Sequence, residues 1–388
     1  MNYKLIFFLI QFFLWITASL FAESPIKIYQ KPATRKGEFN YYASNSAPLD
    51  YWLIFKVINA QNTQASPSME LKTIIPVGAK DFPIINIRAE NPKKAFQFQI
   101  SYKYSPGNPL TAIHNDNYIY HFPFAHGTKR KLSQGYKGLY THQGWQEFAL
   151  DFEMPEGTEV YAARGGKVIQ VIDHFNEGGA SASYAEKANK VVLLHDDGTY
   201  ASYVHLKLKG SLVKEGEEIK AGDLIGYSGN TGMSQGPHLH FDVILPDFEG
   251  AKTVPTKFLS HDNQVIEPET GKYYYGFWEN KETFETRFGS ELKPEDYADY
   301  SKKLEKTDKF EVRKEVIDDT IVLFASNYFD RDVKLDCFFQ LQNKQKVVEI
   351  PADLNIPALS EIFLTILKPV NPAKPGGYRL RYTYRLEK

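Results

Sequence analysis

The stretch "PHLHFDVIL", residues 237–245, is the clearest strand in the sequence, and it decides the fold class. In an extended chain successive side chains point to opposite faces, so His238 and His240 share one face while Leu239 and Phe241 share the other. One face can pack a core and the other can hold a metal. Imidazole is a common zinc ligand, so two histidines at this spacing can converge on one ion or divide into one ligand and one acid/base group. The alternative is two structural histidines whose hydrogen bonds are satisfied without a metal.

Similar strand patterns surround this stretch and predict an antiparallel β domain at 107–262 with almost no helix. Turn signals such as "DDGT" and "SGNTG" separate the apolar runs. These runs are "EFALDF", "VYAARGGKVIQVI", "NKVVLLH" and "TYASYVHL".

Two distant parts of the chain resemble each other at a nearly constant offset. "YASNSAPLDYWLIFKVINAQN" from Tyr42 compares with "FASNYFDRDVKLDCFFQLQN" from Phe324, and "ISYKY" compares with "LRYTY". A constant offset predicts two copies of one small domain, at 26–106 and 308–388. Short alternating runs broken by Asn, Pro and Gly favour a β-sandwich of immunoglobulin-like type. Residues 263–307 are then a connector, and the whole chain is all-β.

The first 22 residues read as a separate export signal. One positive charge precedes a nearly unbroken apolar run, and Ala22 stands before the charged start at Glu23, which is typical of a cleaved signal peptide. The alternative is an uncleaved membrane anchor, because the run approaches the ~18 residues at which a spanning helix becomes possible. Cleavage predicts an exported protein of the cell envelope, periplasmic or extracellular, with no stable membrane insertion.

Charge and cysteine content narrow the possible partners and cofactors. The formal net charge is -1, from 46 basic and 47 acidic residues, which argues against a nucleic-acid partner. Cys337 is the only cysteine, so no intramolecular disulfide can form. Any zinc must therefore be held by histidines and carboxylates.

Three more polar side chains lie where a metal site needs them. In "EFALDF" the alternation puts Asp151 on the face opposite Leu150 and Phe152. His142 lies shortly upstream in "YTHQGW", and His205 ends an apolar run in "YVHLK". A hydrolytic zinc site needs three protein ligands, an open position for water and a group that moves protons, and these residues can supply them.

The order of these motifs resembles the M23 (lysostaphin/LytM-type) zinc peptidase family. The matching segments are "THQG…ALDFEMPEGTEVYAARGGKV", "NKVVLLHDDGTYASYVHL" and "GEEIKAGDLIGYSGNTGMSQGPHLHFDV". The resemblance implies that His142, Asp151 and His240 bind Zn²⁺ and that His205 and His238 serve catalysis. The glycines of "SGNTGMSQG" suit a loop along a narrow substrate groove, for which we expect contributions from Asn230, Thr231 and Gly232.

One spacing departs from the family pattern. Well-known members have HxxxD, whereas nine positions separate His142 from Asp151, and Glu147 stands four before Asp151. An inserted loop can return His142 to the metal, and Glu147 is the alternative first ligand. The family can also place a tyrosine upstream that helps to stabilise the oxyanion, and Tyr136 and Tyr140 are the candidates.

The resemblance implies an exported zinc metalloendopeptidase that hydrolyses peptide bonds of peptidoglycan, by water activated on the metal and two catalytic histidines. An alternative enzyme is a secreted protease of Gly-rich proteins. An alternative from another class is a catalytically inactive scaffold that activates other wall hydrolases. The presence of competent residues at every candidate position favours the enzyme.

Overall fold

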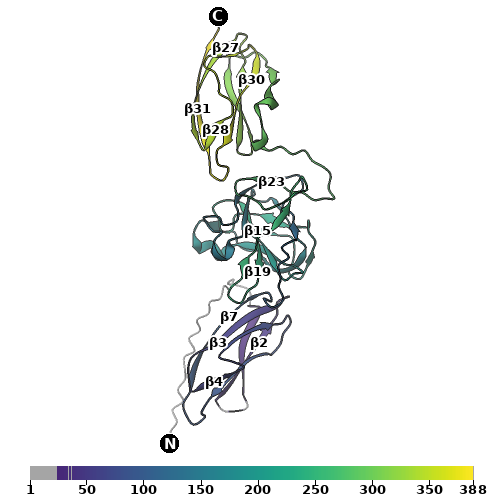
Figure 1. Cartoon of the computed structure of the whole chain (residues 1–388), viewed down its shortest axis with the longest axis vertical. Coiled ribbons are helices and arrows are strands. Elements are labelled where there is room, and N and C mark those ends of the chain that lie inside the picture. The colour runs from purple at the N-terminus through teal and green to yellow at the C-terminus, as the bar shows by residue number, and fades with distance from the viewer. Residues whose placement is uncertain (1–23, 34, 36, 388) are drawn as a thin grey trace. The chain divides into compact units, whose positions relative to one another are not determined.

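The computed structural model describes residues 24–33, 35 and 37–387 (Figure 1). The predicted signal peptide lies outside the described residues. Strands dominate, and the helices are short 3-10 turns, so the all-β prediction is confirmed. The chain divides into two compact units: residues up to Ala125 with Gly135–Glu267, and His126–Gln134 with Pro268–Lys388.

The N-terminal part of the first unit folds as two sheets over one apolar core. Its four-stranded sheet has the order β1-β2-β6-β4 and its three-stranded sheet the order β5-β3-β7. Leu53, Phe55 and Ile87 are fully buried between them. The strands are β1(Ile26–Lys31), β2(Glu38–Asn45), β3(Tyr51–Gln61), β4(Thr63–Ser66), β5(Glu70–Ile75), β6(Phe82–Ala89) and β7(Gln97–Pro106).

The C-terminal strands of the second unit repeat this strand order. The paths β25-β26-β30 with β28 beside β30, and β29-β27-β31, correspond to the two sheets above, and β24 adds a fifth strand beside β30. The immunoglobulin-like type and the domain boundaries stay predictions. The elements of this unit are β9(Lys129–Gln134), β23(Tyr273–Tyr275), η3(Gly289–Glu291), η4(Pro294–Tyr297), β24(Ser301–Lys303), β25(Phe310–Ile317), β26(Thr320–Asn327), β27(Val333–Gln342), β28(Lys344–Lys346), β29(Leu354–Ile356), β30(Ser360–Pro369) and β31(Gly377–Leu386).

The rest of the first unit is built on one antiparallel sheet that carries the candidate site. Within this unit its strands run in the order β16-β12-β14-β15-β19-β10, with β11, β17 and β20 beside this path. The elements are β8(Ile119–Tyr120), η1(Gly144–Gln146), β10(Leu150–Glu153), β11(Glu159–Tyr161), β12(Gly166–Ile172), β13(Gly178–Gly179), η2(Ala182–Lys187), β14(Asn189–Leu194), β15(Tyr200–Ser211), β16(Glu218–Ile219), β17(Leu224–Ser228), β18(Gly232–Met233), β19(His238–Leu245), β20(Lys252–Thr253), β21(Lys257–Leu259) and β22(Val265–Ile266).

An aromatic core covers one face of this sheet and fixes its register. Phe241 on β19 packs edge-to-face on Tyr203 of β15 and on Phe258, and Phe152 of β10 packs edge-to-face on Phe122. All of these rings are at most 1% exposed. Because side chains alternate between faces, burying these rings turns Asp151 and His240 to the opposite face.

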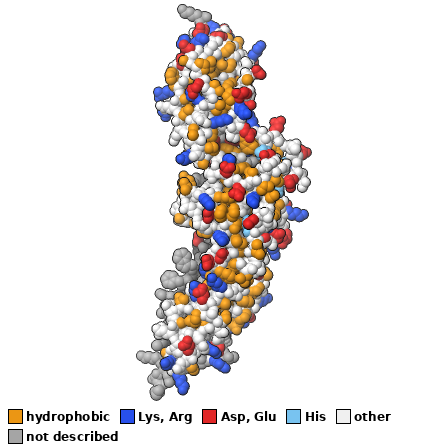
Figure 2. Space-filling model, in the orientation of Figure 1, with side chains coloured by type: hydrophobic (Ala, Val, Ile, Leu, Met, Phe, Trp, Pro, Cys, Tyr) orange, Lys and Arg blue, Asp and Glu red, His pale blue; other side chains and the backbone are white. Residues whose placement is uncertain are grey.

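The surface shows no single dominant charge. Figure 2 shows basic and acidic side chains interspersed over the face in view, as the net charge of -1 leads one to expect. In the described part of the chain, no helix has both the length and the apolar character needed to cross a membrane.

His195 is a buried residue that directly follows β14. Its Nδ1 donates to the carbonyl of Gly165 at 2.9 Å, and its buried Nε2 has no hydrogen-bond partner among the described residues. Burial, together with the nearby charge of Arg164, lowers the pKa of His195 to about 4. The ring is therefore neutral in the folded protein at neutral pH.

We predict that His195 makes the protein sensitive to mild acid. Its pKa is about 6.5 in the unfolded chain and about 4 in the folded one, so the unfolded state binds the proton first and the free energy of unfolding decreases as pH falls from 6.5 towards 4. At 1.36 kcal/mol per pKa unit, the parent should lose about 2 to 3 kcal/mol more than His195→Gln between pH 7 and pH 4.5. Urea titrations of both proteins at the two pH values measure this difference. Equal losses would show that His195 does not titrate as described.

Candidate metal centre

Asp151 and His240 face each other across two paired strands. In the antiparallel pair of β10 and β19, Asp151 lies directly opposite His240. Directly opposed residues project on the same side of a sheet, and Asp151 Oδ1 is 2.9 Å from His240 Nδ1. Both residues are less than 9% exposed. The alternation read from the sequence therefore brings the two groups into contact.

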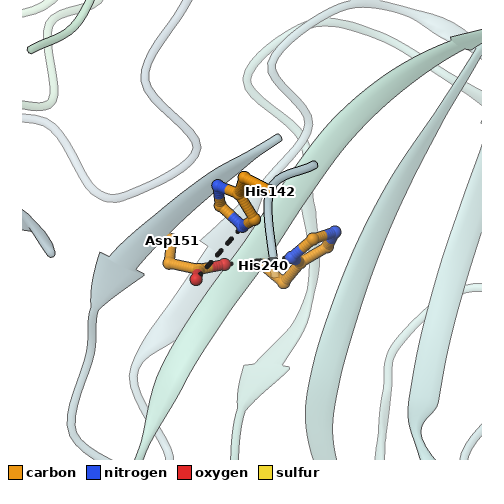
Figure 3. A group of neighbouring side chains, drawn as sticks. All are labelled: His142, Asp151 and His240. Atoms are coloured by element: carbon orange, nitrogen blue, oxygen red, sulfur yellow. Dashed lines mark hydrogen bonds and ion pairs between the residues drawn. The ribbon is translucent and has the colours of Figure 1, made fainter. Parts of the chain in front are cut away.

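His142 reaches the same point from the loop before η1. Its Nδ1 donates to the carbonyl of Gly135 at 2.9 Å, so the lone pair lies on Nε2. Nε2 is 3.2 Å from Asp151 Oδ2, and Figure 3 shows the carboxylate joined to both imidazole rings. His142 is fully buried, and its Nε2 has no hydrogen-bond partner of good geometry among the described residues.

The charges of this group are strongly coupled. Burial opposes ionisation of Asp151, but the contacts of its carboxylate with His142 and His240 outweigh it and hold the pKa of that carboxyl well below its usual range. Burial likewise opposes protonation of His240, yet its contacts with Asp151 and Asp242 raise its pKa to about 10. Without a metal, the site therefore holds a buried ion pair between ionised Asp151 and protonated His240. The proton on His240 Nδ1 then lies where a metal ion would bind.

The three side chains could hold a metal ion. One ligand atom from each of His142, Asp151 and His240 lies within 4.8 Å of the others. A buried imidazole nitrogen that carries a lone pair needs a hydrogen-bond donor or a metal ion beside it. Glu147 is not a member of this group, and it forms a 3.5 Å ion pair with Lys137 on the surface.

His205 enters the same face of the sheet through a β-bulge. On β14, Lys190 pairs with Val204 and Asn189 with Leu206, which leaves His205 as the extra residue on β15. Its φ of 66° lies in the left-handed region, which costs a non-glycine residue about 1 to 3 kcal/mol. Bulges re-aim side chains, and here the imidazole of His205 comes within 6.0 Å of the His240 ring, measured between centroids.

His205 and His238 form a close pair beside the metal group, with ring centroids 4.5 Å apart. His205 Nδ1 donates to the Thr231 carbonyl at 2.6 Å, and His238 Nδ1 donates to the Gly236 carbonyl at 2.8 Å. Each ring therefore keeps its lone pair on Nε2, and His238 Nε2 is 3.7 Å from Asp151 Oδ1. Burial, and then the charges of the neighbouring histidines, lower the pKa of His205 to about 3.

The predicted groove residues Asn230, Thr231 and Gly232 have different environments. Thr231 is 5% exposed, and its hydroxyl donates to the Leu206 carbonyl at 2.7 Å and accepts from the Asn189 amide. Gly232 is also buried, and a Cβ there would lie 2.5 Å from that of Ala188. Asn230 is partly exposed and accepts from Ser234. Thr231 and Gly232 are thus buried residues that stabilise the loop, and of the three only Asn230 is partly exposed to solvent.

The structure adds one residue that the sequence reading did not single out. His240 Nε2 lies 3.2 Å from Oδ2 of Asp242, which is 3% exposed and two positions along β19. The signal was present in the sequence, because residues i and i+2 of a strand share a face.

The two tyrosine candidates differ in position. Tyr136 is bonded through its hydroxyl to Thr256, and burial raises its pKa to about 12. Tyr140 is 84% exposed.

Part of the chain is similar to known peptidases. Residues 146–252 match the model of peptidase family M23. Peptidoglycan DD-endopeptidase ShyA of Vibrio cholerae is 37% identical over 116 residues, which are 30% of this chain and 23% of ShyA. Lysostaphin of Staphylococcus simulans is 36% identical over 109 residues, which are 28% of this chain and 20% of lysostaphin. The matches thus span less than a quarter of either relative.

The solved catalytic domain of lysostaphin from Staphylococcus simulans is 30% identical to this chain. The match covers 32% of this chain and 87% of that domain, with a TM-score of 0.24. The family-model match covers the strands that carry Asp151, His205 and His240, and the sequence identity to the lysostaphin catalytic domain extends over most of that domain. The chain therefore belongs to peptidase family M23.

Proposed function

We propose that this protein is an exported zinc metalloendopeptidase that hydrolyses peptide bonds of peptidoglycan. The observation that carries the proposal is the convergence of His142 Nε2, Asp151 and His240 Nδ1, with the lone pair of His142 buried and unused in the described structure. Such a lone pair is costly unless an ion or a donor meets it.

The donor set fits zinc. Two imidazole nitrogens and one carboxylate are ligands that Zn²⁺ takes in catalytic sites, with a fourth position left for water or substrate. His142 and His240 would bind through Nε2 and Nδ1, and Asp151 through its carboxylate. When bound, the ion supplies Lewis acidity to a substrate carbonyl and acidifies the attacking water.

The pair His205 and His238 is arranged to take a proton from that water. Backbone carbonyls hold a proton on Nδ1 of each ring, so both Nε2 atoms are acceptors. The rings lie so close that a positive charge on one opposes a positive charge on the other, and the pair is therefore suited to carry one proton at a time. The ring that has taken the proton can then donate it to the leaving amine.

The substrate class follows from the named relatives. ShyA is named a peptidoglycan DD-endopeptidase, and another relative, ALE-1 of Staphylococcus capitis, a glycyl-glycine endopeptidase; both match about a quarter of their length. We assign peptide bonds of peptidoglycan to this chain on that basis. The predicted signal peptide is consistent with a protein that reaches the cell envelope, periplasmic or extracellular.

Digestion of purified peptidoglycan tests the proposal. The mature chain, loaded with zinc, should release fragments with new amino termini that mass spectrometry identifies, and the metal-stripped chain should not. Wall preparations of several chemotypes are needed, because relatives differ in the bond named. No cleavage with zinc demonstrably bound would favour the inactive scaffold, and cleavage of Gly-rich proteins alone would favour the secreted protease.

We predict that three side chains hold the zinc. His142→Ala and His240→Ala should each reduce bound zinc from one equivalent to a small fraction, because each removes one of only three protein ligands. Glu147→Ala is the matched control and should keep its zinc, since Glu147 pairs with Lys137 instead. Elemental analysis after dialysis measures the content, and thermal unfolding checks the fold. Loss of zinc in Glu147→Ala with retention in His142→Ala would reverse the assignment of the first ligand.

We also predict that His205 and His238 contribute to hydrolysis but are not zinc ligands. His205→Ala and His238→Ala should each retain most of the zinc and lower the rate of peptide hydrolysis by about 10²-fold or more, since proton transfer contributes in the transition state. Metal content and hydrolysis rate must be measured on the same samples. If His238→Ala lost zinc as completely as His240→Ala, both histidines would be ligands.

A further inference from the structure

Asp242 is a buried carboxylate that contacts a member of the metal group but does not belong to it. It lies on β19 two residues after His240, on the same face of the sheet, and its Oδ2 is 3.2 Å from His240 Nε2. Nε2 is the ring nitrogen that points away from Asp151, whose Oδ1 meets Nδ1 of the same ring. His240 is therefore held between two carboxylates.

Asp242 is buried with only one of its oxygens in a hydrogen bond. It is 3% exposed, and its Oδ1 has no hydrogen-bond partner in the described part of the chain. Its one ion pair among the described residues is with His240, and the charge of Lys190 interacts with it from a longer distance. A buried carboxylate with one oxygen unsatisfied is destabilising. Its retention in the core of the sheet indicates a role that depends on His240.

Asp242 differs from the groups that hold the other three histidines. His142, His205 and His238 donate their outer N–H to backbone carbonyls, which any sequence provides. His240 alone uses a side-chain carboxylate for this contact. A carboxylate accepts a hydrogen bond and also carries charge, so it can fix the ring and make its other nitrogen a stronger ligand.

We propose that Asp242 is a positioning residue for the metal centre: it keeps the proton of His240 on Nε2 and directs the lone pair of Nδ1 at the ion. The inference rests on the proposed function in that the ion is taken to be zinc. Partners that hold the outer N–H of a metal-bound histidine typically change metal affinity 10-fold to 100-fold when they are removed.

Zinc affinity of two variants tests the proposal. Asp242→Ala should weaken zinc binding by about 10-fold to 100-fold in competition with a chromophoric chelator. Asp242→Asn should lose less, because its amide oxygen still accepts the hydrogen bond while the charge is gone. The matched control is Ser202→Ala: Ser202 lies opposite Asp242 on β15 and is 7% exposed. Its zinc affinity should stay within about twofold of the parent.

A second measurement separates positioning from a general effect on the fold. In the metal-free parent, the Nε2 proton of His240 should be shifted downfield and protected from exchange in ¹⁵N-edited NMR spectra. In Asp242→Ala this signal should be lost while the thermal unfolding midpoint and the signal of the His142 Nδ1 proton persist. Unchanged zinc affinity and an unchanged His240 signal in Asp242→Ala would overturn the proposal.

The two readouts also separate this inference from the proposed function. Absence of zinc binding by the parent chain would contradict the proposed metalloenzyme, and the His240 Nε2 proton would then decide alone whether Asp242 holds the ring. If Asp242→Ala does not fold, Asp242→Asn supplies both measurements. In that case, zinc affinity within about twofold of the parent together with the absence of a downfield-shifted His240 Nε2 proton in Asp242→Asn would overturn the proposal, because the ring would bind the ion without the hydrogen bond.

Discussion

The antiparallel register of β10 and β19 sets Asp151 opposite His240, and the metal group depends on it. The same register pairs Leu150 with Phe241 on the reverse face, where both are at most 1% exposed. A shift by one residue would turn Asp151 into the aromatic core and an apolar side chain into the site. The burial of apolar side chains on one face therefore fixes the polar chemistry on the other, and each buried ring contributes about 1.5 to 3 kcal/mol to holding it.

The site is organised before any ion arrives. All four histidines use one ring nitrogen for a contact that only an N–H can make, to the carbonyls of Gly135, Thr231 and Gly236 or to Asp242. In His142, His205 and His238 these contacts leave the lone pair on Nε2, whereas both nitrogens of His240 face carboxylates. A single carboxylate, Asp151, is shared by His142 and His240. The side chains that could hold a metal are thus already oriented in the fold.

Sequence periodicity predicted the parts of the site that obey the strand alternation. It placed Asp151 and His240 on one face, and it held the signal for Asp242. His205 breaks the rule: regular alternation would put it on the core side with Tyr203, and only the bulge at φ 66° turns it to the metal. Only the resemblance to the family suggested His142. Its local sequence does not predict that its loop folds back so that the imidazole bonds to the carbonyl of Gly135.

The groove loop shows a further limit of sequence reading. Glycines and small polar residues suggested contact with substrate, but Thr231 satisfies the backbone at Leu206 and Asn189 instead. Thr231 therefore orients the histidine pair, because its backbone carbonyl accepts the hydrogen bond from His205 Nδ1. Polar residues that serve a buried network and polar residues that serve a ligand have the same composition, and only the direction of their hydrogen bonds separates them.

Exposure indicates how a substrate must approach. The side chains of His142, His240 and Asp151 are 0%, 9% and 11% exposed, whereas the His238 side chain is 17% exposed. Solvent therefore reaches the site mainly past His238, the residue whose Nε2 is also 3.7 Å from Asp151. A molecule that enters by this route meets Nε2 of His238, the ring nitrogen left free to accept by the Nδ1 hydrogen bond to Gly236, before it meets the three candidate ligands.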